Sequence, residues 1–352
     1  MQPKCVHVLF GTLISAGLCF GADSLPVPAD PHELVTGPVQ IASTPADRAA
    51  AFGLLERAKQ NADMHMLGMS PFNVKINFSA SGSSTFNGPG TITELWFSGR
   101  QWRYDQSLAG YSEARVSTNG RMAAKGIESL PLRVAMLRSA MFWPVGGNPS
   151  NFGLRTASSQ WNAHPVTCLL LSGMQPAPTP TRLWEETEYC VDNTSGLLQI
   201  FSRAPGTYVV YGYAGNLQFH GRQVPDQITM YVAGKSVLDG SVSIADANPA
   251  DATLVTPDSS MVSTQTNGMN MRLSLPVGAP VAGATVKPVI VNVTIDRQGR
   301  VAEAEVSAAS DPSLANSALD AVKKMNFGPS ESWRQAYINV RFFSGAASSG
   351  AN

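Results

Sequence analysis

Short segments in which apolar and polar residues alternate recur along the middle of this chain, and turn signals separate them. Residues 72–78 read FNVKINF, the period of a half-buried strand. The other candidate strands cover 91–97, 101–104, 115–118, 122–125, 166–171, 184–191, 197–201, 207–213, 227–232 and 236–244. Asn119-Gly120 between two of them is typical of a type I′ hairpin turn. Many short strands at even spacing predict one antiparallel sheet, strongly curved or closed.

Two helices are expected to accompany this sheet. Residues 47–66 carry alanine and leucine at helical spacing, and 131–142 form a second apolar stretch that ends before Pro144. The second helix could fill the concave face of the sheet. Residues 49–245 are therefore predicted to form a curved antiparallel β domain with helices, in an α+β chain.

Charge excludes one class of partner. Only 14% of the 352 residues are charged, and 25 basic residues balance 25 acidic ones. A protein that neutralises phosphates needs a basic excess, so nucleic-acid binding is not expected.

The N-terminus resembles an export signal. Lys4 precedes an apolar run over 5–20, and small residues at Cys19 and Gly21 fit a cleavage site after Gly21. Residues 1–21 are predicted to be a signal peptide, with 22–48 as a proline-rich linker, which places the chain in the periplasm. An uncleaved segment would instead anchor it in the inner membrane.

Cleavage would leave two cysteines, Cys168 and Cys190. Thiols of an exported protein can oxidise, so a disulfide between them is predicted, and two buried free thiols are the alternative.

The C-terminal part changes character twice. Residues 246–287 are rich in Ser, Thr, Asn, Ala and Pro, and are predicted to be a flexible linker with one candidate strand at 271–275. A compact ββαβ module is expected over 288–344, with its helix at 313–325 and its last strand at 337–343. Residues 345–352 are predicted to be a disordered tail.

The module resembles the TonB C-terminal domain family. The matching residues are VIVNVTIDRQGRV at 289–301, the helix segment SLANSALDAV at 313–322, and AYINVRFF at 336–343. The resemblance implies a partner in the envelope, such as an outer-membrane transporter. A free edge on the last strand would bind such a partner by β-augmentation. The predicted partner-binding residues are Tyr337, Ile338, Asn339, Val340, Arg341 and Phe342.

The middle region more weakly resembles the LolA/LolB-like half-barrel, through its leading helix, the LWFSGRQWRYD stretch and the Asn119-Gly120 hairpin. That resemblance implies an apolar cavity for a lipid or acyl chain, lined by Trp96, Trp102 and Met136. A lipid or lipoprotein carrier is accordingly the alternative function.

No arrangement of residues in the sequence indicates catalysis. The five histidines lack metal-ligand spacing with another His or Cys, and no nucleophile elbow, P-loop or dinucleotide fingerprint occurs. The acidic cluster Glu185, Glu186 and Glu188 is interpreted as a solvated strand edge. The sequence thus favours a non-enzymatic periplasmic adaptor, with no catalytic residues, metal or cofactor expected.

Overall fold

A computed structural model describes residues 39–66, 68–82, 85–126, 130–146, 152–162, 164–173, 182–265, 269–278 and 285–344. The predicted signal peptide, most of the predicted linker at 22–48 and the predicted tail lie outside these residues. Within the described part of the chain, no helix is both long and apolar enough to cross a membrane.

The middle of the chain forms one large antiparallel sheet. Its spatial order is β1-β7-β8-β9-β10-β11-β14-β15-β2-β3-β4-β5-β6-β16. The strands are β1 (Gln40–Ile41), β2 (Phe72–Ala80), β3 (Gly88–Ser98), β4 (Gln101–Leu108), β5 (Tyr111–Thr118), β6 (Arg121–Lys125), β7 (Gly153–Trp161), β8 (His164–Ser172), β9 (Thr187–Asp192), β10 (Leu198–Ala204), β11 (Thr207–Gly212), β14 (Gln227–Val232), β15 (Lys235–Asp246) and β16 (Val262–Thr264). A small hairpin, β12 (Gln218–Phe219) and β13 (Arg222–Gln223), stands apart.

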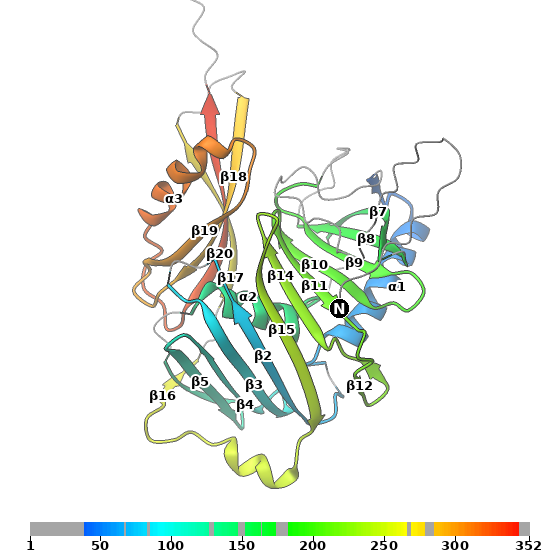
Figure 1. Cartoon of the computed structure of the whole chain (residues 1–352), viewed down its shortest axis with the longest axis vertical. Helices are drawn as coiled ribbons and strands as arrows, with labels where there is room; N and C mark the ends of the chain where they lie inside the picture. The colour runs from blue at the N-terminus through cyan, green and yellow to red at the C-terminus, as the bar shows by residue number, and fades with distance from the viewer. Residues whose placement is uncertain are drawn as a thin grey trace, which may run out of the picture.

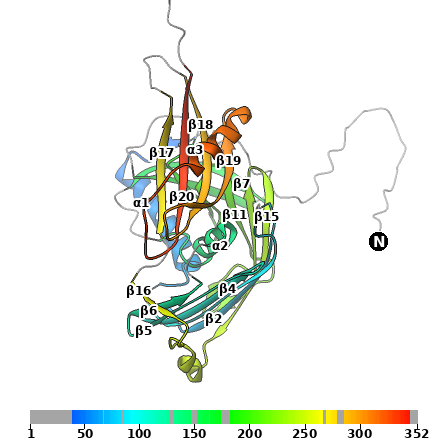
Figure 2. The same cartoon turned by 90° about the vertical axis from the view of Figure 1, so that its left-hand side faces the viewer.

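This sheet curves around two helices, α1 (Pro45–Ala62) and α2 (Leu132–Phe142), as Figures 1 and 2 show. The alternation of apolar and polar residues explains why these segments form strands with one buried face. In β2 every second residue is buried and the others are exposed. Ten of the eleven residues of α2 are buried. The sheet with α1 and α2 is called the half-barrel below.

The N-terminal boundary of the half-barrel lies earlier than predicted. Gln40 and Ile41 pair with β7, and Thr44 caps α1 by accepting the N–H of Asp47. The linker prediction for 22–48 is therefore wrong over these last residues. Pro45, at the first helical position, fits because its missing N–H would have no partner there.

A buried acid ends α1. Asp63 is 4% exposed, and its Oδ1 accepts the N–H of Val145 at 3.1 Å. Burial raises the pKa of Asp63 to about 6, and the hydrogen bond from Val145 and the charge of Lys59 only partly oppose the rise. A negative charge at a helix C-terminus is also unfavourable. The carboxylate form thus destabilises the folded state.

Asp63→Asn is expected to raise the free energy of unfolding at pH 8 by about 2 kcal/mol. The folded-state pKa of Asp63 lies above its ordinary value, so the penalty is absent below about pH 4, grows between about pH 4 and pH 6, and is complete above about pH 6. The amide oxygen of the introduced asparagine can still accept the Val145 hydrogen bond. Urea unfolding at pH 4.5 and pH 8 measures the difference. A variant that is less stable than wild type at pH 8 contradicts this account.

The disulfide between Cys168 and Cys190 is present. These residues face each other across the neighbouring strands β8 and β9, so the bridge links two adjacent strands near one end of the large sheet.

The C-terminal module is a second, four-stranded sheet with one helix on its outer face. Its order is β17-β20-β18-β19, from β17 (Met269–Val277), β18 (Thr285–Ile295), β19 (Val301–Ala309) and β20 (Arg334–Ser344). Asp311 caps a short 3₁₀ turn, Pro312–Leu314, that leads into α3 (Ala315–Lys323). Gly299 has φ +87° in the β18–β19 turn, a conformation that favours glycine.

The predicted flexible linker at 246–287 is wrong for its described residues. A 3₁₀ helix (Pro249–Leu254) follows β15, β16 pairs with β6, and β17 pairs with β20. The candidate strand at 271–275 is confirmed within β17. Its apolar side chains at every second position, Met271 to Val277, pack against the core under α3, and this burial fixes a segment of otherwise weakly structured composition.

The predicted fold class is confirmed. The chain is α+β, with a curved antiparallel sheet around helices followed by a small ββαβ unit to which β17 is added.

Candidate functional site

The C-terminal sheet lies between α3 and the half-barrel (Figure 1), and its inner strands β18 and β20 bury side chains on both faces. In β18, Val289, Val291 and Val293 pack toward α3, whereas Asn292 on the opposite face donates from Nδ2 to Oγ1 of Thr207 at 2.8 Å. All of these side chains are buried. The half-barrel therefore covers the face of the module that α3 leaves open.

Charged side chains of β19 cap the N-terminus of helix α2 and form an ion pair with it. This helix has no capping side chain of its own, and the N–H of Leu132 donates to Oε2 of Glu303 at 2.7 Å. Both terminal nitrogens of Arg133 donate to the carboxylate of Glu305, at 2.5 and 2.6 Å. Carboxylates are favourable at a helix N-terminus, where N–H groups lack partners. The contacts between α2 and β19 are called the junction.

The predicted docking edge on the last strand is wrong. β20 lies inside the sheet, with β17 on one flank and β18 on the other. The six residues concerned are Tyr337, Ile338, Asn339, Val340, Arg341 and Phe342. Their main chain is paired on both sides, because the segment expected to be a linker supplies β17. A partner strand has no free flank there.

β17 is instead the edge strand. It runs parallel to β20 over nine residue pairs, from Met269 with Arg334 to Val277 with Phe342. Among the described residues, no strand pairs with its other flank. Ser274 and Pro276 are exposed on it.

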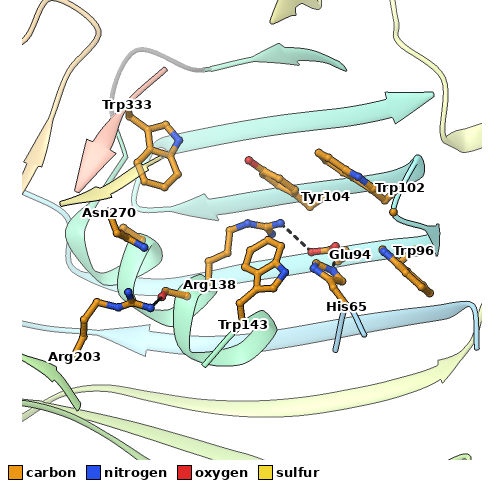
Figure 3. Close-up of a pocket in the computed structure, with 13 residues that line it drawn as sticks. His65, Glu94, Trp96, Trp102, Tyr104, Arg138, Trp143, Arg203, Asn270 and Trp333 are labelled. Atoms are coloured by element: carbon orange, nitrogen blue, oxygen red, sulfur yellow. Dashed lines mark hydrogen bonds and ion pairs between the residues drawn. The ribbon is translucent and has the colours of Figure 1, made fainter. Parts of the chain in front are cut away.

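A cavity of about 400 Å³ lies where the half-barrel meets the module (Figure 3). Residues of α2, β3, β4 and β10 form most of its wall, and the module contributes Asn270 and Trp333. The volume is within the usual range for a small-molecule site, about 300–1,000 Å³.

Aromatic rings dominate the wall of this cavity. The rings are His65, Trp96, Trp102, Tyr104, Trp143 and Trp333. Trp102 and Tyr104 stack with centroids 5.7 Å apart and planes inclined by 4°. The ring of His65 lies 5.9 Å from Trp96 and 4.5 Å from Trp143. Such flat surfaces suit a ring-shaped ligand.

One buried acid lies at the centre of the cavity wall. Oε1 of Glu94 is 2.5 Å from Nε2 of His65, and its Oε2 is 3.0 Å from Nη2 of Arg138. The guanidinium of Arg138 also lies 3.5 Å over the ring of Tyr104. Burial raises the pKa of Glu94, but the charges and hydrogen bonds of His65 and Arg138 outweigh burial and hold it below its ordinary value. Glu94 is therefore ionised at neutral pH.

Two of the three residues that were predicted to line a cavity do so, and the third does not. Trp96 and Trp102 line the cavity, whereas Met136 is 3% exposed in the core between α2 and the sheet. Side chains of α1 and α2 fill the concave face, so the alternative of an acyl-chain carrier is not favoured. The histidine–glutamate pair had no local sequence signal that identifies a site.

The acidic cluster is not a solvated edge. Glu186 forms two hydrogen bonds of 2.7 Å with Arg155, and Glu188 lies 3.0 Å from Arg182. Both glutamates are 1% exposed. These ion pairs lie inside the half-barrel and hold it together, so the interpretation from sequence is corrected.

Cys168, Glu188 and Cys190 lie close enough together to resemble a metal site among the described residues. Metal-binding cysteine is a thiolate, and here the two sulfurs are bonded to each other. The expectation that the chain needs no metal stays a prediction.

Solved structures with a similar middle region include LolA-type proteins. A LolA superfamily protein of Nitrosomonas europaea is 12% identical, with 56% of this chain and 91% of that chain covered and a TM-score of 0.33. A DUF1329 family protein of Desulfovibrio piger is 9% identical, with 59% and 96% covered and a TM-score of 0.37. Similarity at this level carries no argument about ligands. No curated protein matches the chain. Residues 288–343, which span most of the C-terminal module, match the family of the Gram-negative bacterial TonB protein C-terminal domain.

Proposed function

We propose that the chain is a non-catalytic adaptor of the bacterial envelope, whose C-terminal module binds an extended segment of an envelope protein along β17. The match of residues 288–343 to the TonB C-terminal family supports an envelope partner. The export signal expected over residues 1–21 supports the periplasm as the compartment. The LolA-like resemblance of the middle region adds no ligand to this proposal.

The observation that carries the proposal is the open flank of β17. An edge strand presents a row of unpaired N–H and C=O groups, which an extended peptide can pair with. Proteins usually protect such an edge with charged side chains or with proline, and β17 carries one proline, Pro276, near its end. The one charged residue of β17, Arg272, has its guanidinium occupied by the carbonyl of Trp184 and Oγ1 of Thr187. No charge on β17 is therefore left to block its outer flank.

The junction makes this an adaptor rather than an isolated docking module. Because β19 caps α2 and pairs with Arg133, a partner held on β17 is fixed relative to the half-barrel. The half-barrel would then be presented to whatever the partner is attached to.

Photo-cross-linking at position 274 tests the proposal. A photoreactive residue in place of Ser274, on the edge, is expected to capture an extended segment of an envelope protein, which mass spectrometry of the adduct identifies. The matched control is the same residue in place of Ser241. Ser241 is also exposed in a strand, but β14 and β2 pair with that strand on both flanks.

A lysine at position 274 provides the second arm. Ser274→Lys is expected to abolish capture from a photoreactive residue in place of Pro276, whereas Ser241→Lys leaves it unchanged. Equal capture from positions 274 and 241, or capture that survives Ser274→Lys, contradicts docking on β17.

A further inference from the structure

The cavity at the base of the module has an excess of positive charge. Glu94 is the single carboxylate among its lining residues, and the guanidinium of Arg138 already neutralises it. Arg203 remains: one terminal nitrogen donates to Oγ of Ser139 at 3.2 Å, and its guanidinium lies 5.5 Å from the ring of Phe201. No carboxylate of the described residues forms an ion pair with it, and its Nε has no hydrogen-bond partner there.

A second guanidinium lies behind Arg203. The side chain of Arg272 donates to the carbonyl of Arg203 and to two further oxygens, none of which is a carboxylate. Burial, followed by the charges of Arg182 and Arg203, lowers the pKa of Arg272 to about 10. The positive charges of Arg203 and Arg272 thus repel each other. An anion near Arg203 would lower the electrostatic free energy of both groups.

The lining also offers hydrogen-bond donors in excess of acceptors. Nη1 of Arg138 and Nε1 of Trp333 are buried without a partner among the described residues, on side chains that are 6% and 7% exposed. Figure 3 shows Arg138 reaching into the middle of the cavity, with Arg203 and Asn270 at one end. Buried donors without partners are costly, so a ligand that supplies acceptors is favoured.

The mouth of the cavity exposes an aromatic ring. Trp143 is 39% exposed, although it follows directly on a buried helix and packs its edge against His65. Trp102 adds a second indole ring to the wall of the same cavity, whereas the ring of Tyr104 is already covered by the guanidinium of Arg138. Aromatic surfaces of this kind stack on the face of an aromatic or sugar ring.

We propose that this cavity binds a small anionic ligand that consists of one aromatic or sugar ring and a carboxylate or phosphate group. The acid would pair with Arg203, and the ring would stack on the tryptophans. The cavity volume of about 400 Å³ suits a single ring with its substituents. An acyl chain suits the cavity less well, because it offers no ring to stack on the tryptophans. Asn270 of β17 lines the site, but the proposed ligand does not pair with the outer flank of that strand.

Titration of the whole chain with matched pairs of probes, followed by calorimetry, tests the proposal. One pair is glucuronate and neutral methyl glucoside, and the other is phenylacetate and neutral phenylacetamide. At least one acid is expected to bind about tenfold more tightly than its neutral partner, because only the acid can form a charge-assisted hydrogen bond with Arg203. The pair that binds identifies the ring as sugar or aromatic. Acetate alone is expected to bind more weakly than either acid.

Variants locate the binding. Arg203→Gln is expected to remove most of the preference for the acid, and Trp143→Ala to weaken acid and neutral probe alike by about tenfold. Arg121→Gln, at an exposed arginine of β6, is the control and is expected to change neither. Trp143 is partly exposed, so its variant should fold even if Arg203→Gln does not. Absence of binding by both acids, equal binding of acid and neutral probes, or an equal effect of Arg121→Gln would overturn the proposal.

Discussion

Gly206→Ala is expected to lower the free energy of unfolding by about 3–4 kcal/mol and to loosen the module from the half-barrel. Gly206 lies between β10 and β11 with φ +74°, and a Cβ there would be 1.9 Å from the carbonyl oxygen of Ser307 on β19. The left-handed backbone costs an L-residue about 1–2 kcal/mol. Moving β19 away adds a further cost of about 1–3 kcal/mol, as in an overpacked core.

Gly221→Ala separates these two costs. Gly221 has nearly the same backbone angle, φ +77°, but nothing lies within 4 Å of the added carbon. Its replacement is expected to cost only the backbone contribution, about 1–2 kcal/mol. Urea unfolding of both variants gives the two values, and limited proteolysis reports whether the module has separated. Equal losses would mean that β19 does not press on the turn at Gly206.

Local sequence signals were enough to predict most of the elements, although β7 was not among the predicted strands. Strict alternation identified β2, and Asn119-Gly120 identified the β5–β6 turn, where both residues have positive φ. Asp311 and Pro312 marked the start of the helical segment that leads into α3. Each of these features depends on residues within one or two turns of chain, and such interactions are visible in a single sequence.

The position of β17 could not be predicted in the same way. Its apolar side chains recur at every second position, but Ser, Asn and Pro surround them, and the strand is stabilised by β20, whose residues follow more than sixty positions later. Composition alone therefore favoured a linker. This error changed the predicted docking site, because the additional strand moved the edge of the sheet from β20 to β17.

The charged part of the cavity was missed for a related reason. Trp96 and Trp102 were found because aromatic residues stand out in a strand. Glu94, His65 and Arg138 come from three separate parts of the chain, and only folding brings their charges together. One signal was present and unused: Arg133 and Arg138 interrupt a helix that is otherwise apolar, and a buried arginine needs a partner.

The partner of Arg133 gives the second large effect. Glu305→Leu is expected to lower the free energy of unfolding by about 3–5 kcal/mol, because it leaves a guanidinium that is 2% exposed without its counter-ion. Arg133→Met should cost less, about 2 kcal/mol, since the carboxylate of Glu305 is 17% exposed and water can reach it.

The double variant decides what the ion pair contributes. With methionine at position 133 and leucine at position 305, both charges are removed. Each original side chain is then replaced at the junction by an apolar one of similar size. Buried ion pairs replaced in this way are often neutral in stability, so the double variant is expected to lie within about 1 kcal/mol of wild type. Urea unfolding of the wild type and the three variants forms a complete cycle. Additive losses would mean that Arg133 and Glu305 act separately, and that the module is held by the caps and apolar contacts of the junction instead.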